Sequence, residues 1–116
     1  MKSFFKSFYY AFNGILTALT QVNLRVHLTA AVVAVAAGFY FDITTGEWLM
    51  VILAIGFVIS MELMNTAMEH LVNLVSPQHQ PLAGKVKDIA AGAVLVASAA
   101  AGVIGVMIFW KYFFGI

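Results

Sequence analysis

The segment that decides the fold is IAAGAVLVASAAAGVIGVMIFW, residues 89–110, in which no side chain is charged. A helix of this length crosses the hydrocarbon core of a bilayer, which takes about 20 apolar residues. Two other uncharged stretches, residues 26–41 and 48–61, are shorter and reach a spanning length only if their helices continue through polar neighbours. The sequence therefore predicts three membrane-spanning helices, over residues 23–42, 47–75 and 82–112.

The composition also indicates a membrane protein. Of the 116 residues, 63% are hydrophobic and 9% are charged, too few polar side chains to cover a water-soluble domain. The formal net charge of +1, without any basic cluster, excludes the electrostatic footprint of a nucleic-acid-binding protein. Cysteine is absent, which excludes disulfides, thiolate metal sites and cysteine nucleophiles. We expect an all-α integral membrane protein with a single domain, residues 1–116.

The first 20 residues have the pattern of an amphipathic helix. Phe4, Phe5, Phe8 and Phe12 recur at helical spacing, whereas Lys2 lies on another face. Aromatic residues with flanking lysines suit a helix that lies in the membrane interface, over residues 1–20. The residues leave a second possibility open, in which this helix packs against the bundle as a fourth member.

The positive residues predict the orientation in the membrane. Lys2, Lys6 and Arg25 precede the first span, and Lys85 and Lys87 lie between the second and the third. Positive residues favour the cytoplasmic side. This places the N-terminus and residues 76–88 in the cytoplasm, and the turn at residues 42–47 and the C-terminus outside.

Four polar residues, Glu62, Asn65, Glu69 and Asn73, occupy the second half of the second predicted span. At about 100° per residue they fall within an arc of about 80° and form one stripe along the helix. If the helix enters the membrane near Glu47, its rise puts Glu62 about 22 Å further in and Glu69 about 10 Å beyond. The stripe is thus predicted to line the cytoplasmic half. Ionisable residues within a membrane are functional candidates, because placing them there is costly.

The two carboxylates of the stripe suit different chemical roles. The deeper Glu62 is closer to low dielectric, as fits a general base that takes a proton from an alcohol. Glu69, closer to the interface, can stay ionised and hold a divalent cation such as magnesium. A structural reading stays open, in which the polar groups satisfy one another inside a bundle. Asn73 in particular could be only a helix-end polar group.

Charged residues also begin the third span. Lys85, Lys87 and Asp88 follow the proline-bounded connector, and lysine at a helix start is unfavourable for the helix dipole. Binding of a polyphosphate would explain this placement, as would a purely topological role for the lysines.

A second polar cluster, Gln21, Arg25 and His27, stands at the entry to the first span, where it could meet the stripe. None of the three histidines belongs to a pair with ligand spacing on its own helix, so we expect no zinc site.

Two blocks together resemble the signature of the prokaryotic diacylglycerol kinase family, which includes the undecaprenol kinases: ELMNTAME, residues 62–69, and KDIAAGAVL, residues 87–95. The resemblance extends to the aromatic N-terminal helix, to NLRVH at residues 23–27 and to GEW at residues 46–48. It implies a small enzyme of the bacterial inner (cytoplasmic) membrane. Such enzymes have a surface helix and three spans, and work as homotrimers that phosphorylate a lipid alcohol with ATP and Mg²⁺.

The same resemblance implies a role for each matching residue. Glu62 would be the general base, and Asn65 would position the reacting groups. Glu69 would bind the metal that accompanies the nucleotide. Lys87 would contact the phosphates of ATP, and Asp88 the nucleoside.

Two positions depart from the family pattern. Gln21 stands where the family usually has a glutamate that is a second metal ligand, and Asn73 stands where it usually has aspartate. A carboxamide can offer an oxygen to magnesium but, lacking charge, should hold it less tightly. We predict an ATP-dependent kinase of undecaprenol or diacylglycerol. The alternatives are a catalytically impaired member that binds lipid or nucleotide, and a membrane scaffold or transporter subunit.

Overall fold

The computed structural model describes residues 1–115, which form four helices. The three longer helices are long and apolar enough to cross a membrane, which confirms the predicted all-helical chain with three candidate spans. The four helices are α1 (Lys2–Ala18), α2 (Val22–Phe41), α3 (Thr45–Val75) and α4 (Pro81–Phe114), and α1 is the shortest of them.

Local sequence explains where the helices begin and end. At the start of α3, Thr44 Oγ1 accepts a hydrogen bond from Glu47 N (3.2 Å), and Glu47 Oε1 accepts one from Thr44 N (3.0 Å), which forms a capping box. Asp42 ends α2 in the left-handed conformation, with φ of 51°. Pro77 follows the last residues of α3, and Pro81 occupies the first turn of α4, where its missing N–H is no loss.

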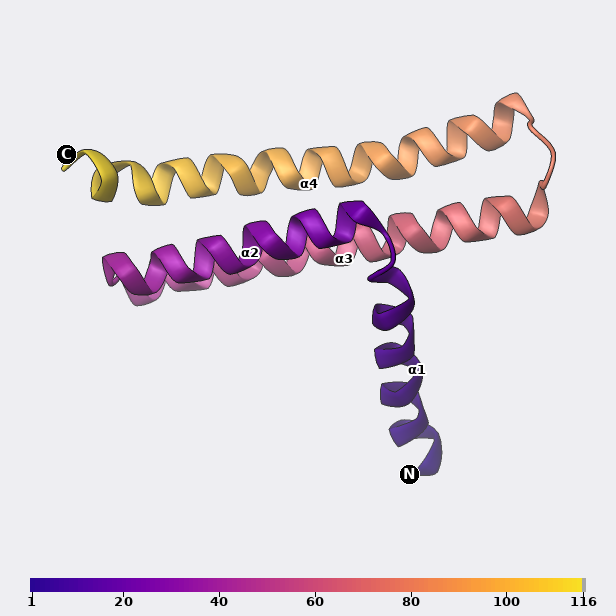
Figure 1. Cartoon of the computed structure of the whole chain (residues 1–116), viewed down its shortest axis with the longest axis horizontal. Coiled ribbons are helices and arrows are strands. Elements are labelled where there is room, and N and C mark those ends of the chain that lie inside the picture. The colour runs from indigo at the N-terminus through magenta and orange to yellow at the C-terminus, as the bar shows by residue number, and fades with distance from the viewer. Residues whose placement is uncertain (116) are drawn as a thin grey trace.

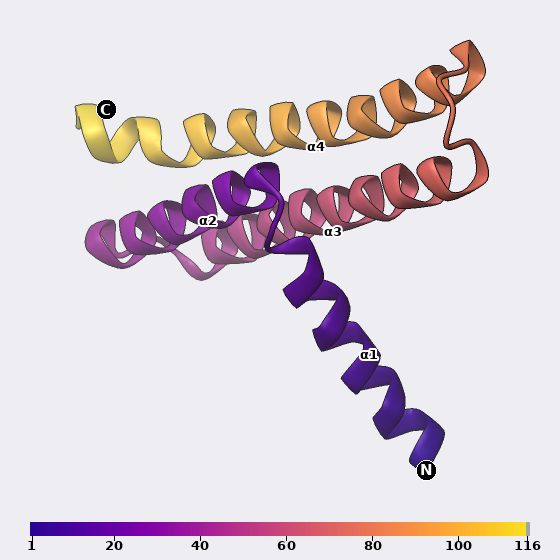
Figure 2. The same ribbon diagram turned by 45° about the vertical axis from the view of Figure 1, so that its right-hand side comes forward.

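Helix α3 is the centre of the arrangement, because α1, α2 and α4 all contact it. In Figures 1 and 2, α2, α3 and α4 run alongside one another, with α2 shorter than the other two. The ends of α3 and α4 joined by residues 76–80 extend beyond the start of α2. A bundle of this shape has an end where three helices meet and another where only α3 and α4 continue.

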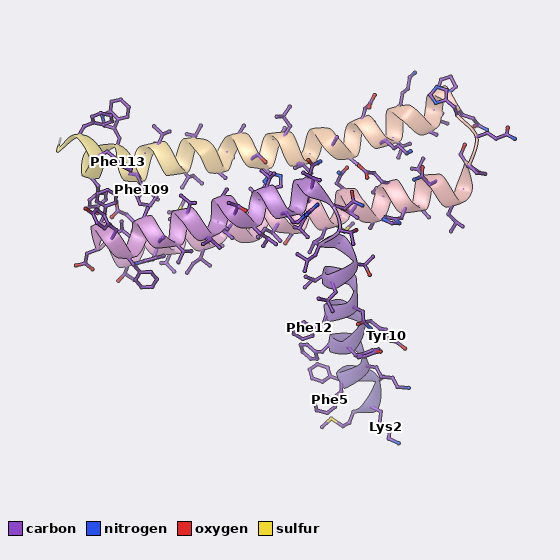
Figure 3. All side chains as sticks on the ribbon, viewed as in Figure 1. Lys2, Phe5, Tyr10, Phe12, Phe109 and Phe113 are labelled. Atoms are coloured by element: carbon purple, nitrogen blue, oxygen red, sulfur yellow. The ribbon has the colours of Figure 1, made fainter. Side chains whose placement is uncertain are left out.

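Helix α1 leaves the bundle sideways from the start of α2 and does not lie along it (Figures 1 and 2). The one residue of α1 that is buried is Ala18, next to the junction. Figure 3 shows Phe5 and Phe12 on one side of α1, and Lys2 and Tyr10 on the other. The placement excludes α1 as a fourth member of this chain's own bundle. That α1 lies in a membrane interface stays a prediction.

Aromatic and charged contacts hold the three long helices together at the end opposite residues 76–80. Phe41 of α2 packs against Phe113 of α4, with ring centroids 4.9 Å apart. Figure 3 shows Phe113 near the C-terminal end of α4. Glu47 of α3 accepts a hydrogen bond from the Tyr112 hydroxyl (2.5 Å) and forms an ion pair with Lys111 (2.8 Å). Because Lys111 and Tyr112 are both on α4, these two contacts fix the register of α3 and α4 at this end.

Gly38 is needed where α2 passes over the Trp48 ring. A Cβ atom at this position would lie 2.6 Å from Trp48 Cη2 and 2.8 Å from Cζ2. Such distances are not tolerated, so the ring or the helix would have to shift.

We predict that Gly38→Ala destabilises the protein by about 1–3 kcal/mol, a typical value for overpacking. The measurement is thermal unfolding of the purified protein in detergent. Gly56→Ala is the matched control, since a Cβ there meets nothing within 4 Å. Equal unfolding temperatures for the two variants would contradict the tight α2–α3 crossing.

Candidate functional site

The polar residues that are buried as a whole, among those that the structure describes, all come from one stretch of α3. Glu62, Asn65 and Thr66 are 2%, 5% and 6% exposed. Further along the same face Glu69 is half-buried and Asn73 is exposed. The stripe therefore runs from the interior of the bundle to its open end, as its helical spacing suggests.

Two buried oxygen atoms of the stripe have no hydrogen-bond partner. Asn65 Nδ2 donates a hydrogen bond to Glu69 Oε1 (3.3 Å), which fixes the orientation of the amide group. Asn65 Oδ1 is left without a hydrogen-bond partner. Glu62 Oε2 is also buried and unpaired. Buried acceptors are nearly always paired in proteins, and an unpaired one costs about 1–3 kcal/mol. Both oxygens are thus suited to receive a hydrogen-bond donor or a cation from outside the chain.

Helix α2 contributes one side chain to the deep end of the stripe. His27 Nε2 lies 3.8 Å from Glu62 Oε2, and the two side chains are 20% and 3% exposed. The sequence predicts that the cluster of Gln21, Arg25 and His27 can meet the stripe, but it does not assign His27 to Glu62 in particular. The sequence does contain a signal for this contact. Helices α2 and α3 form a hairpin around residues 42–44, and His27 and Glu62 are separated from that turn by similar numbers of residues.

At the open end, the stripe meets α4. Lys87 Nζ donates a hydrogen bond to Asn73 Oδ1 (2.6 Å) across the connector. No ion pair with a carboxylate is found for Lys87 among residues 1–115. The lysine is therefore oriented by a neutral amide and keeps an uncompensated positive charge.

The structure does not join the remaining predicted residues to the stripe. Gln21 is the N-cap residue of α2, and Arg25 and Asp88 are exposed. No side-chain hydrogen bond or ion pair within the described chain links any of the three to Glu62, Asn65 or Glu69.

The donor set fits magnesium better than zinc. No cluster of three or more His, Asp or Glu side chains suited to a metal occurs in the part of the chain that the structure describes. Glu69 offers one carboxylate, and Asn65, whose Nδ2 faces Glu69, offers an amide oxygen that has no hydrogen-bond partner. Magnesium commonly takes one or two carboxylates and completes its shell with phosphate and water.

An apolar cavity of about 290 Å³ opens between α2, α3 and α4. His27 lies at one end and Phe109 at the other, and Ser98 contributes a buried hydroxyl that has no hydrogen-bond partner. Much of the wall is made of alanine and glycine, including Ala30, Ala34, Ala54, Ala101, Gly102 and Gly105. The cavity follows the spanning part of the bundle and reaches the deep end of the stripe.

The site is level with the point where α1 joins α2. Ala18 of α1 and Thr66 of α3 line the same crevice. From there towards residues 76–80, only α3 and α4 continue (Figure 1). If α1 marks the plane of the interface, Glu62 lies just inside it, and Asn73 and Lys87 lie on its aqueous side.

Comparison with known proteins finds similar sequences over most of the chain. Residues 9–109 match the family model described as prokaryotic diacylglycerol kinase. An undecaprenol kinase from Bacillus subtilis (strain 168) is 44% identical over 110 residues, which cover 94% of this chain and 89% of that protein. A diacylglycerol kinase from Synechocystis is 38% identical over 101 residues, 85% of this chain and 58% of that protein. One from Escherichia coli (strain K12) is 25% identical over 105 residues, 90% and 86% of the two chains.

Two glutamates of α3 should respond oppositely to the same substitution. Glu62→Gln is expected to raise the unfolding temperature by a few degrees, because it removes a buried carboxylate that has an unpaired oxygen. Glu47→Gln is expected to lower it, because Glu47 is held by Lys111, Tyr112 and Thr44. Thermal unfolding in detergent measures both. A drop for Glu62→Gln as large as that for Glu47→Gln would indicate that Glu62 has only a structural role.

Proposed function

Because this chain belongs to the prokaryotic diacylglycerol kinase family and is a lipid kinase, we propose that it transfers the γ-phosphoryl group of ATP to the hydroxyl of a membrane lipid alcohol. The acceptor we propose first is undecaprenol, since the relative at 44% identity is an undecaprenol kinase. Diacylglycerol is the alternative acceptor. The single observation that carries the proposal is the buried Glu62, with one carboxylate oxygen free.

Glu62 acts as the general base in this proposal. The O–H bond of the lipid breaks and its proton passes to the carboxylate, while the lipid oxygen forms a bond to the γ-phosphorus. The bond between that phosphorus and the bridging oxygen breaks, and ADP leaves with the electron pair. General bases of this kind contribute about 10²–10⁴-fold to a rate. Asn65, one turn along α3, would help to position the reacting groups.

Charge stabilisation comes from the open end of the stripe. Glu69 and the unpaired Asn65 Oδ1 would hold Mg²⁺, which when bound supplies positive charge next to the phosphates. Lys87, whose charge no carboxylate of the described chain offsets, would bind ATP phosphates. We assign Asp88 to the nucleoside, and Arg25 and Asn73 to the polar rim of the site.

The arrangement of the helices suits one substrate that comes from the membrane and another that comes from water. The lipid would reach Glu62 laterally, with its chain along the apolar cavity, and ATP would come from the aqueous side at Lys87. We propose that α1 lies in the cytoplasmic interface of the inner membrane, with the N-terminus in the cytoplasm. A homotrimer would close the site, because the three spans of a single chain give it little enclosure.

A second candidate function is that of a catalytically impaired member that binds lipid or nucleotide. Gln21 favours it, because this residue has no charge and makes no side-chain hydrogen bond to Glu69 in the structure. The two candidates differ in whether phosphate is transferred at all.

The test of the proposed function is transfer of phosphate from labelled ATP to undecaprenol and to diacylglycerol in parallel, in mixed micelles. We expect label in undecaprenol, and a fall in kcat of about 10²–10⁴-fold for Glu62→Gln with binding of ATP unchanged. Label in diacylglycerol alone would show that the acceptor is diacylglycerol and not undecaprenol. ATP binding without label in either lipid would favour the impaired member, and absence of ATP binding would contradict both.

The metal assignment predicts a change in magnesium dependence. Glu69→Gln should raise the Mg²⁺ concentration for half-maximal activity by about 10–100-fold, because it removes the carboxylate nearest to Asn65. Gln21→Glu should lower that concentration if Gln21 reaches the metal in the working complex. Glu47→Gln is the control, since Glu47 contacts Lys111 and Tyr112 instead. An unchanged requirement in Glu69→Gln would exclude Glu69 as the ligand.

A further inference from the structure

A buried base has to lose its proton before it can act again. This inference rests on the proposed role of Glu62, a residue that is 2% exposed and lies between the helices of the bundle. After one transfer the lipid proton is on Glu62, and water reaches the side chain poorly. The site therefore needs a group that accepts this proton and also reaches the solvent.

The neighbours of Glu62 leave one such group. Asn65 and Thr66 are buried and do not take up protons near neutral pH. Glu69 is the other carboxylate of the stripe, but it accepts a hydrogen bond from Asn65 and is assigned to the metal. The imidazole of His27 on α2 lies next to Glu62, with Nε2 3.8 Å from Oε2.

His27 is also the more accessible of the two groups. Its side chain is 20% exposed, against 3% for Glu62. The separation of 3.8 Å is longer than a hydrogen bond, so His27 does not fix the orientation of the carboxylate through one. A small rotation or one bridging water would connect the two groups. Imidazole is the side chain that most readily accepts and releases protons near pH 7.

We propose that His27 is the proton outlet of the site. The O–H bond on protonated Glu62 breaks, the proton passes to Nε2 of the neutral imidazole, and the imidazolium releases a proton to water. Glu62 returns to the carboxylate and the imidazole to its neutral form, so no other reactant is consumed. His27 acts after phosphoryl transfer and does not contact the phosphate.

The experiment compares the first turnover with later ones. Wild-type protein, His27→Ala and His27→Gln are mixed with labelled ATP and excess lipid alcohol, and product is followed by rapid quench. We expect the first turnover of both variants to stay within about two-fold of wild type, and their steady-state rate to fall by about ten-fold or more. The product should then appear as a burst followed by a slow phase.

Added imidazole distinguishes a proton carrier from a structural residue. It should restore the slow phase of His27→Ala, where a cavity is left, and should do less for His27→Gln, whose side chain fills the space. His79→Ala, at an exposed position in the connector, is the control and should behave as wild type.

The outcomes separate this inference from the proposed function. A slow first turnover without a burst would show that His27 positions Glu62, and an unchanged steady-state rate would show no role; either result overturns the outlet. Lack of rescue by imidazole in a folded His27→Ala would also overturn it. Failure of the wild-type protein to phosphorylate any lipid alcohol would instead overturn the proposed function.

Discussion

The structure depends on one constraint, which is that the carboxylate of Glu62 is buried between helices whose other side chains are mostly apolar. Glu62 is nearly as buried as any residue of the chain, yet one of its oxygens has no partner. An apolar residue at this position would pack more favourably, since neither the desolvation of a charge nor an unpaired acceptor would arise. The unfavourable placement is understandable if the oxygen receives a proton during the reaction, and this explains why the polar face of α3 is turned inward.

The rest of the bundle makes such a site possible. At one end, Phe41, Phe113 and the contacts of Glu47 with Lys111 and Tyr112 hold α2, α3 and α4 together. At the other end, α2 stops and only α3 and α4 continue. The contacts that stabilise the bundle therefore lie at one end, and the opening to the site lies at the other. Glu62 lies between the two ends. Asn73 and Lys87, in contact across the connector, place positive charge at this open end.

Much of this could be predicted from the sequence, for identifiable reasons. The long uncharged run of residues 89–110 indicated a spanning helix by its length alone, and the proline-bounded connector marked a helix boundary. The stripe from Glu62 to Asn73 followed from the 3.6-residue period, which is a local property. Family membership and lipid kinase activity, implied by two short blocks, are confirmed by the comparisons.

What the sequence did not show depends on register between helices. The contacts His27–Glu62 and Lys87–Asn73 arise from how far each helix runs from its connecting turn, and a shift of one residue would rotate either side chain away. The joining of Glu47 to Lys111 and Tyr112 also depends on the combined lengths of α3 and α4.

The most direct measurement of the central claim is labelling with dicyclohexylcarbodiimide, a hydrophobic reagent that reacts with protonated carboxyl groups inside membranes. Peptide mapping by mass spectrometry would identify the modified residue, and kinase activity would be followed in the same samples. The account predicts that Glu62 is modified ahead of Glu47 and Glu69, that activity falls in step with its modification, and that the lipid substrate slows both. Modification of Glu62 with kinase activity intact would contradict the account.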